Sequence, residues 1–317
     1  MLFRDRSSAY VGLVAAMLSV AACGASRDAQ SPATAAPDAR ITNAVALPDT
    51  DDFGTPLPRD ASLSARVVSL NPTATEIIFA LGQEQHLVGR SRWDAYPPRV
   101  TSIADVGDGI RPNVEAVLAV RPTLVILYAT AENRPAARAL AEAGVPTIAL
   151  RVDRIAQFES LTRRLGVALG ASPRAAQVID TVQATLTSIR KAAGHADRPP
   201  TVVWPLWQSP VMVVGRGSYL NELIDIVGAR NVFDDLDAPS PIVSIEEIAR
   251  RDPTFVVATQ ATANRLLASP AWRAVRAVRE GRIVLDDPSL TGRPSVVLGM
   301  AAHALAVSLD SVRGTRK

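Results

Sequence analysis

The segment Asn113–Leu127, NVEAVLAVRPTLVIL, is the most informative part of the sequence about the fold, because a distant segment repeats its pattern. The second stretch is Ser244–Ala258, SIEEIARRDPTFVVA. Each begins with a residue that caps helices and continues through a short helical segment and a proline to a run rich in β-branched residues, which predicts a helix followed by a strand. Glu115 and Glu246 stand at matching positions. The recurrence predicts two similar halves.

Short apolar strands alternate with helical segments on both sides of these stretches, which indicates βαβ units and mostly parallel sheets. The exception is the segment 173–193, which has apolar residues at helical spacing, no internal glycine and no strand partner. We interpret it as a long helix between the halves. The predicted fold class is α/β, with two Rossmann-like lobes joined by a single long α-helix. The predicted divisions are a signal peptide and lipobox (1–23), a flexible tether (24–64), an N-terminal lobe (65–170), the linking helix (171–195) and a C-terminal lobe (196–317).

The first 23 residues have the pattern of a secretory signal. Arg4 and Arg6 precede an apolar run over 9–22 that is too short for a membrane span. The run ends in Val20–Cys23, VAAC, which resembles the lipobox of bacterial lipoproteins, whose cysteine is acylated. Because Cys23 is the only cysteine of the chain, we expect lipidation there and no disulfides. The alternative is an ordinary signal peptide with an incidental cysteine.

The composition argues against nucleic-acid binding despite a pI of about 9.4. The formal net charge is only +3, and the positive residues are scattered arginines. Only Lys191 and Lys317 are lysines. After residue 64 about 250 residues remain, enough for one large domain or for two lobes of ordinary size.

Two such lobes leave a cleft where the carboxyl ends of the strands meet, and this cleft is the expected ligand site. Aromatic residues there are informative because they make up only 4% of the chain. Tyr128 ends a predicted strand at the cleft edge, and Trp204 and Trp207 lie at or just after the end of the first strand of the second half. Flat amphipathic rings suit the face of a large planar ligand. We interpret Trp204 as a core residue and Trp207 as a ligand contact.

Several segments together resemble the periplasmic (class III) binding proteins of ABC importers for vitamin B12, haem and ferric siderophores. They are RVVSLNPTATEIIFALG (66–82), LVG (87–89), DAYPP (94–98), NVE (113–115) and RPTLVI (121–126). The resemblance covers residues 66–309 and implies two lobes bridged by a rigid helix, with an ABC permease and its ATPase as partners. It is nearest to the vitamin B12-binding type, although the aromatics expected near Gly109, Ser240 and Pro288 are absent.

The resemblance also implies roles for individual residues. Trp93 stands where the B12-binding relatives place an aromatic residue, and Glu115 and Glu246 match the glutamates that dock into arginine pockets of the permease. The alternative for these glutamates is a first-turn acid favoured by the helix dipole. We give Glu76 and Glu247 that simpler role, because each follows a capping residue by three positions. The full set of expected ligand-binding residues is Asn71, Arg92, Trp93, Tyr128, Trp207 and Arg293.

Catalytic and metal chemistry have little support in the sequence. His86, His195 and His303 fit no zinc spacing. The first strand leads into Asn71-Pro72-Thr73 instead of a glycine-rich loop, which argues against a dinucleotide cofactor. We expect no catalytic residues, no metal site and no cofactor.

The sequence therefore predicts a monomeric, non-enzymatic lipoprotein of the periplasm that binds a corrinoid between its lobes and delivers it to a permease. Three alternatives remain. The ligand is a ferric siderophore or haem, with Arg92, Arg216 and Arg293 as candidates to pair with its acidic groups. The chain is an enzyme with a catalytic cleft. Or it is a tethered sensor that binds without delivering.

Overall fold

The computed structural model describes residues 50–57, 65–194 and 196–314. The described residues all belong to one compact unit. The predicted signal sequence and Cys23 lie outside them. Within these ranges, no helix has both the length and the hydropathy that a membrane crossing requires.

The N-terminal lobe, residues 65–170 (the N-lobe), contains a four-stranded parallel sheet in the order β2-β1-β3-β4. Its strands are almost wholly buried, as expected for a parallel sheet covered on both faces. The strands are β1 (Val67–Ser69), β2 (Leu87–Arg90), β3 (Leu124–Tyr128) and β4 (Thr147–Leu150). The helices are α1 (Pro72–Ala80), α2 (Val114–Ala119), α3 (Arg134–Glu142) and α4 (Ile155–Ala168), with 3₁₀ turns η2 (Glu84–His86), η3 (Pro98–Ser102) and η4 (Ala131–Asn133).

The C-terminal lobe, residues 196–314 (the C-lobe), repeats this plan with a parallel sheet in the order β10-β9-β5-β8. Its strands are β5 (Thr201–Val203), β8 (Arg230–Asn231), β9 (Phe255–Ala258) and β10 (Ile283–Leu285). Its helices are α6 (Tyr219–Ile226), α7 (Ile245–Arg251), α8 (Gln260–Ala268), α9 (Arg276–Arg279), α10 (Pro288–Thr291) and α11 (Leu298–Gly314), with the turn η5 (Ala271–Ala274).

One predicted strand of the C-lobe lies outside the parallel sheet. β7 (Val211–Val213) pairs antiparallel with β6 (Pro205–Gln208), and the two form a separate hairpin. The sequence did not predict β6, because Pro205 reads as a break in the chain. A proline is tolerated at the first position of a strand in such a small sheet.

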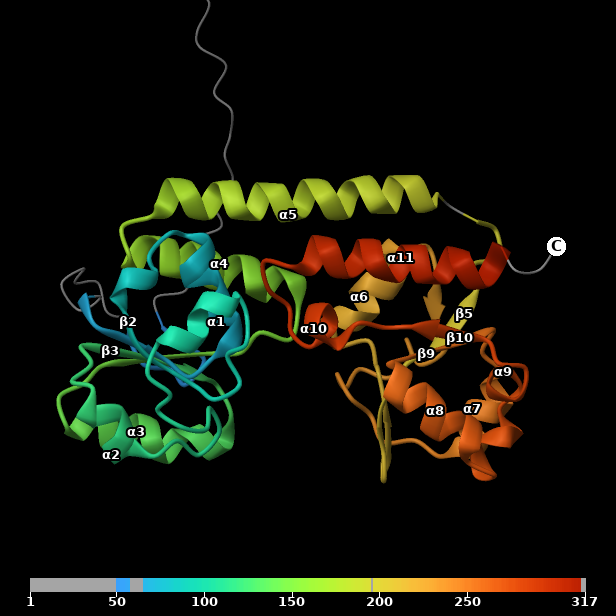
Figure 1. The fold of residues 1–317 in the computed structure, drawn as a ribbon, viewed down its shortest axis with the longest axis horizontal. Helices are drawn as coiled ribbons and strands as arrows, with labels where there is room; N and C mark the ends of the chain where they lie inside the picture. The colour runs from blue at the N-terminus through green and yellow to red at the C-terminus, as the bar shows by residue number, and fades with distance from the viewer. Residues whose placement is uncertain (1–49, 58–64, 195, 315–317) are drawn as a thin grey trace, which may run out of the picture. The chain divides into compact units, whose positions relative to one another are not determined.

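The predicted linking helix is α5 (Ser172–Ala193), which packs against α4 of the N-lobe and α11 of the C-lobe (Figure 1). A glycine on each partner permits close approach. A Cβ at Gly166 of α4 would lie 2.5 Å from Cβ of Ala175, and a Cβ at Gly299 of α11 would lie 2.8 Å from Cγ2 of Thr185. One hydrophobic cluster includes buried residues of α1, α4, α5, α6 and α11, so the lobes share part of their core.

The repeat predicted from the sequence is confirmed in backbone geometry. α2 is followed by Arg121 and α7 by Asp252, and both residues are left-handed, with φ of 49° and 46°. α1 and α6 are each followed by a glycine in the left-handed region, Gly82 with φ of 70° and Gly228 with φ of 72°. Corresponding helices therefore end in the same way in both lobes.

Two details of the sequence interpretation are corrected. The N-cap of α1 is Asn71, whose side chain accepts a hydrogen bond from the Thr73 backbone N–H, so Thr73 and Glu76 do not form the expected capping box. The expected tether over 24–64 is also too long. Residues 50–57 pack against the N-lobe, with Asp51 5% exposed and Leu57 against the hydrophobic core.

Candidate functional site

A cavity of about 350 Å³ lies at the carboxyl edge of the C-lobe sheet. Trp204, Thr259 and Asp286 line it, and each is the first residue after a parallel strand, β5, β9 and β10 respectively. This is the place where ligands bind in open α/β sheets. Asp153 of the N-lobe also lines the cavity, so both lobes contribute to it.

The wall of this cavity is apolar and hydroxylated, with two carboxylates. Trp204, Leu206 and Leu220 supply apolar surface, and Asp153 and Asp286 supply the carboxylates. No arginine, lysine or histidine among the described residues lines it. Burial raises the pKa of Asp286, while the hydrogen bond from the Thr291 hydroxyl, at 2.7 Å, opposes that rise.

Asp153 connects the predicted contact Tyr128 to the C-lobe. The Tyr128 hydroxyl donates to Oδ1 of Asp153, and the carbonyl of Asp153 accepts from the Tyr219 backbone N–H at 2.7 Å. The Tyr219 hydroxyl donates to the Thr291 carbonyl. Burial raises the pKa of both tyrosines, with Asp153 adding to the rise at Tyr128 and Asp286 at Tyr219. Both phenols therefore stay neutral and act as hydrogen-bond donors.

Two ion pairs join the lobes at equivalent places. Glu76 on α1, the first helix of the N-lobe, pairs with Arg293, which lies shortly before α11, the last helix of the C-lobe. Glu222 on α6 pairs with Arg154, which lies directly before α4, the last helix of the N-lobe. In both pairs, the carboxylate precedes the left-handed glycine of its helix by six residues.

Glu76 is the more deeply buried of the two acids, at 1% exposure. Burial raises its pKa, which Arg293 and the Ser295 hydroxyl partly counter and nearby Asp94 reinforces. Its Oε2 atom and Oδ1 of Asp94 are both buried without a hydrogen-bond partner. Glu76 is therefore an acid that contacts the other lobe, and the role of simple first-turn acid does not describe it.

The remaining predicted ligand residues take different positions. The Asn71 side chain is 2% exposed and committed to the Thr73 N–H and the Leu150 carbonyl. Trp93 and Trp207 are 61% and 63% exposed. Their indole N–H groups donate to Oδ1 of Asp108 at 3.1 Å and to the Ser209 carbonyl at 3.0 Å, which fixes the rings.

The cationic candidates are partly engaged within the protein. Arg293 is held by Glu76, and Arg216 donates to the Asp234 carbonyl and pairs with Asp237 at 3.1 Å. Arg92 is exposed. Trp204 is 3% exposed, so its interpretation as a core residue is confirmed, although it also lines the cavity.

Sequence reasoning missed Asp153, Tyr219, Asp286 and the pair Arg154–Glu222. Asp286 directly follows a predicted strand. The rule that ligands bind at the carboxyl ends of parallel strands, which selected Tyr128, therefore also pointed to Asp286. The equal spacing of Glu76 and Glu222 from their glycines was a signal for the second ion pair. Nothing in the sequence indicated that Asp153 lies beside Tyr128, since the contact depends on the path of the chain after β4.

Glu115 and Glu246 occupy the same position in their lobes. Each is exposed and is the second residue of its helix, after the N-cap residues Asn113 and Ser244. The pKa of Glu246 is lowered by hydrogen bonds, first from its own backbone N–H and then from Ser244. A surface cavity of about 670 Å³, lined by Val114 and residues of α3, adjoins the start of α2 beside Glu115.

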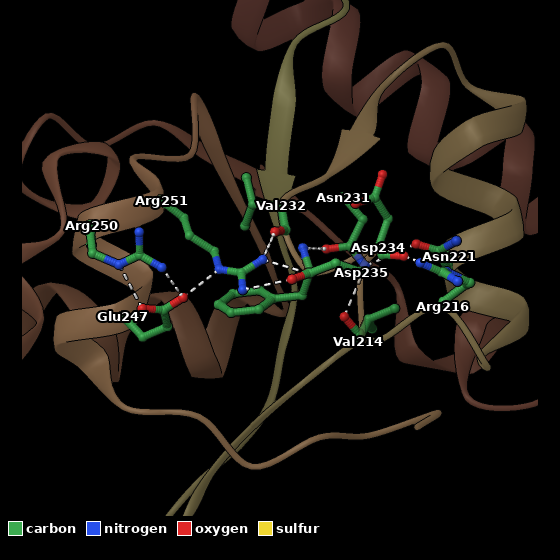
Figure 2. A network of polar contacts seen from close by, with 11 residues as sticks. Val214, Arg216, Asn221, Asn231, Val232, Asp234, Asp235, Glu247, Arg250 and Arg251 are labelled. Atoms are coloured by element: carbon green, nitrogen blue, oxygen red, sulfur yellow. Dashed lines mark hydrogen bonds and ion pairs between the residues drawn. The ribbon is translucent and has the colours of Figure 1, made fainter. Parts of the chain in front are cut away.

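Helix α7 is fixed by a polar network (Figure 2). The Glu247 carboxylate accepts from Arg250 at 2.6 and 2.8 Å and from Arg251 at 2.7 Å. Arg251 reaches on to Asp235 and stacks on the ring of Phe233, 4.4 Å from its centroid. Glu247 therefore stabilises its helix, while its neighbour Glu246 points its charge to solvent. At the matching sites α2 has Ala116, Ala119 and Val120, which lack charged groups.

The described residues include no cluster of three or more histidine, cysteine, aspartate or glutamate side chains arranged to hold a metal ion. The site thus offers rings, hydroxyls and two carboxylates for recognition.

Comparison with known proteins agrees with this geometry. The chain is 26% identical over 257 residues to the ABC transporter substrate-binding lipoprotein YvrC of Bacillus subtilis (strain 168), covering 78% of this chain and 81% of that one. It is 25% identical over 201 residues to a vitamin B12-binding protein of Pectobacterium atrosepticum, covering 62% and 72%. The apo structure of the periplasmic heme-binding protein RhuT from Roseiflexus sp. RS-1 matches with a TM-score of 0.70 and 26% identity, covering 78% and 99%.

The family model described as "Periplasmic binding protein" matches residues 67–290, which include both sheets and the linking helix. This match confirms the family resemblance that the sequence motifs indicated. The chain belongs to the periplasmic binding protein family.

Proposed function

We propose that this chain is the extracytoplasmic substrate-binding component of an ABC importer and that its ligand is a corrinoid of the cobalamin type. Relatives described as an ABC transporter substrate-binding lipoprotein and as vitamin B12-binding proteins support the proposal. In this role the chain captures a ligand and releases it unchanged, without catalysis and without a resident cofactor.

The choice of a corrinoid over haem or an anionic siderophore rests on the charge of the cavity wall. Asp153 and Asp286 contribute carboxylates, and no basic side chain in the described part of the chain lines the cavity. A corrin ring bears amide side chains, whose N–H groups donate well to carboxylates. Haem propionates and anionic siderophores would instead place negative charge against these acids, which is unfavourable in a partly buried site.

The cavity accommodates only part of such a ligand, and other surfaces complete the proposed site. The exposed and fixed rings of Trp93 and Trp207 supply flat surface for a macrocycle. Because their N–H groups are already bonded within the protein, they contribute mainly their faces.

The second candidate is haem. The match to a heme-binding protein at 26% identity favours it, as does the exposed Arg92, which offers a guanidinium to a propionate. In that case the acids of the cavity have to be protonated or avoided by the ligand.

Delivery is proposed to depend on Glu115 and Glu246. Two exposed carboxylates at equivalent helix starts form bidentate, charge-assisted contacts with guanidinium groups of a permease, and such contacts fix orientation. Attachment to the membrane is proposed to run through a lipid on Cys23, which holds the chain in the periplasm at the membrane surface.

The proposal is tested by titrating residues 24–317 with cyanocobalamin, haemin and an anionic ferric siderophore, following tryptophan fluorescence. We expect cyanocobalamin to bind with a Kd of about 1 µM or tighter, equivalent to about −8 kcal/mol. Haemin binding alone would shift the assignment to the second candidate, and absence of binding by all three ligands contradicts the proposed function.

The variant Asp286→Asn tests the charge argument. Asparagine keeps an acceptor for the Thr291 hydroxyl and removes the negative charge. We expect weaker cyanocobalamin binding and stronger haemin binding than in the wild type. Asp287→Asn is the matched control, because Asp287 is exposed and does not line the cavity.

A further inference from the structure

Residues 50–57, which we name the clasp, bind along the outer edge of β4. β4 is the last strand of the N-lobe sheet, so one of its edges has no further strand from the described residues beside it. The Asp52 N–H donates to the Ala149 carbonyl at 2.9 Å, and Oδ2 of Asp51 accepts from the Ala149 N–H at 2.9 Å. Oδ2 of Asp52 accepts from the Arg151 N–H at 2.6 Å. The clasp thus provides hydrogen-bond partners that a neighbouring strand would otherwise supply.

The clasp is a compact turn that Asp51 holds together. Oδ1 of Asp51 accepts from the backbone N–H groups of Phe53 at 2.9 Å and Thr55 at 2.8 Å, so both oxygens of this buried carboxylate are used. Thr50 and Pro56 form a β-bridge that closes the turn. The Arg134 guanidinium lies 4.4 Å from the centroid of the Phe53 ring, a cation–π contact that ties the clasp to α3.

The edge that the clasp covers leads directly to the ligand cavity. Hydrogen-bonding groups on one edge of an extended chain recur every second residue. The clasp binds Ala149 within β4 and Arg151 directly after it, and Asp153 follows two residues later. The carbonyl of Asp153 bonds Tyr219 of the C-lobe, and its carboxylate bonds Tyr128. The segment 149–153 is therefore held by the clasp at its start and by the C-lobe at its end.

We propose that the clasp is a positioning element of the ligand site, because it fixes the segment 149–153 and so places Asp153 in the cavity and against Tyr219. This inference depends on the proposed function only for the identity of the ligand. The clasp lies outside residues 67–290, which the family model matches.

The two aspartates of the clasp allow a matched test in residues 24–317. Asp52→Ala removes the acceptor for the Arg151 N–H, while Asp52→Asn keeps one, since Asp52 is exposed and its amide is free to turn. In Asp51→Asn one of the two carboxylate oxygens becomes an N–H₂ group. With the remaining oxygen bonded to the Phe53 N–H, this N–H₂ group faces the Ala149 N–H, which then has no acceptor. We expect Asp52→Asn to behave as the wild type, and Asp52→Ala and Asp51→Asn to be impaired.

The first readout is ligand affinity at a temperature where every variant is folded. We expect Asp52→Ala to bind cyanocobalamin about fivefold more weakly, the effect of one lost hydrogen bond, and Asp51→Asn to lose more. Unchanged affinity in both variants overturns the positioning role, even if their Tm falls, because a purely structural clasp affects Tm alone.

The second readout needs no ligand. We expect amide exchange to accelerate about fivefold at Tyr219 in Asp52→Ala, with the core amide of Val257 as an unaffected control. Equal exchange at Tyr219 in wild type and both impaired variants overturns the inference. If the wild type binds no ligand, the proposed function fails, and the exchange at Tyr219 alone decides whether the clasp positions this segment.

Discussion

The carboxylate of Glu222 in the C-lobe binds Arg154 in the N-lobe and caps the helix that begins beside it. Its Oε1 accepts from Nε of Arg154, and its Oε2 accepts from the backbone N–H of Ile155, the first residue of α4, at 3.1 Å. A negative group at this place also interacts favourably with the helix dipole. One lobe thus completes a secondary-structure element of the other.

Replacing Glu222 by alanine is expected to lower the free energy of unfolding by about 1–2 kcal/mol, because it removes a helix cap together with an ion pair. Urea unfolding of the two proteins measures the difference. Asp225→Ala on the same helix is the control, since its pair with Arg190, at 3.3 Å, is solvent-exposed and its loss is expected to cost about 0.5 kcal/mol or less. Equal losses in both variants contradict the capping role.

Replacing Arg293 by alanine is expected to cost about 3 kcal/mol at pH 7.5, because the buried Glu76 carboxylate then lacks its counter-charge. The cost depends on pH. The folded-state pKa of Glu76 is raised above its ordinary 4.5, so the folded protein binds the proton more strongly than the unfolded chain, and Glu76 lowers stability as pH rises through that pKa.

The Arg293→Ala defect is therefore expected to shrink as the pH is lowered from 7.5 to 5, because the raised pKa of Glu76 favours its neutral form in the folded protein. Unfolding curves at both pH values measure this. In Glu76→Gln/Arg293→Ala no carboxylate is present at position 76, so the double variant should lack this part of the pH dependence. A defect in Arg293→Ala that is constant with pH disagrees with the assignment.

Replacing Glu115 and Glu246 together by alanine is expected to abolish uptake in cells while the Kd for the ligand stays unchanged, because both side chains are exposed and line no part of the 350 Å³ cavity. Uptake of labelled ligand and a binding titration give the two quantities. Glu142→Ala, an exposed acid at the end of α3, is the control. Persistent uptake in the double variant would favour a sensor that binds without delivering.

Replacing Trp207 by alanine is expected to weaken cyanocobalamin binding by about 1–2 kcal/mol, roughly tenfold, with little change in Tm, because the ring is exposed in the free protein. Trp93→Ala should have a similar effect from the N-lobe. Isothermal titration and thermal unfolding measure both quantities. Val167→Ala, an equally exposed apolar residue on α4, should change neither.

The sequence predicted the fold well because the information is local and repeated. Buried strands such as Leu124–Tyr128 and helices ended by left-handed glycines, such as α1, follow from short patterns of residue types. The duplicated stretch that contains Glu115 and Glu246 then linked the elements into two lobes. The hairpin of β6 and β7 was not predicted, because Pro205 at the start of β6 is typical of a break in the chain and not of a strand.

The candidate site could be predicted only in part, because its polar contacts join residues distant in sequence. Glu76 meets Arg293 across 217 positions, and Asp51 meets Ala149 across 98. A buried carboxylate and a helix-capping carboxylate look alike in sequence, so Glu76 was given the simpler role. Asp51 and Asp52 lie in a segment of low hydrophobicity. Their carboxylates bind backbone N–H groups, which every residue except proline has, so the residue types in the sequence do not indicate these contacts.

The two ion pairs between the lobes, Glu76–Arg293 and Glu222–Arg154, have a consequence for how the chain folds. If the polypeptide were divided within α5, the N-terminal fragment would carry the buried acid Glu76 without a counter-ion, and the Ile155 N–H at the start of α4 would lose its acceptor on Glu222. The C-terminal fragment would keep Arg293 and Glu222 with nothing to bind. Although each half has the plan of an independent domain, we expect the two halves to depend on each other and to unfold together.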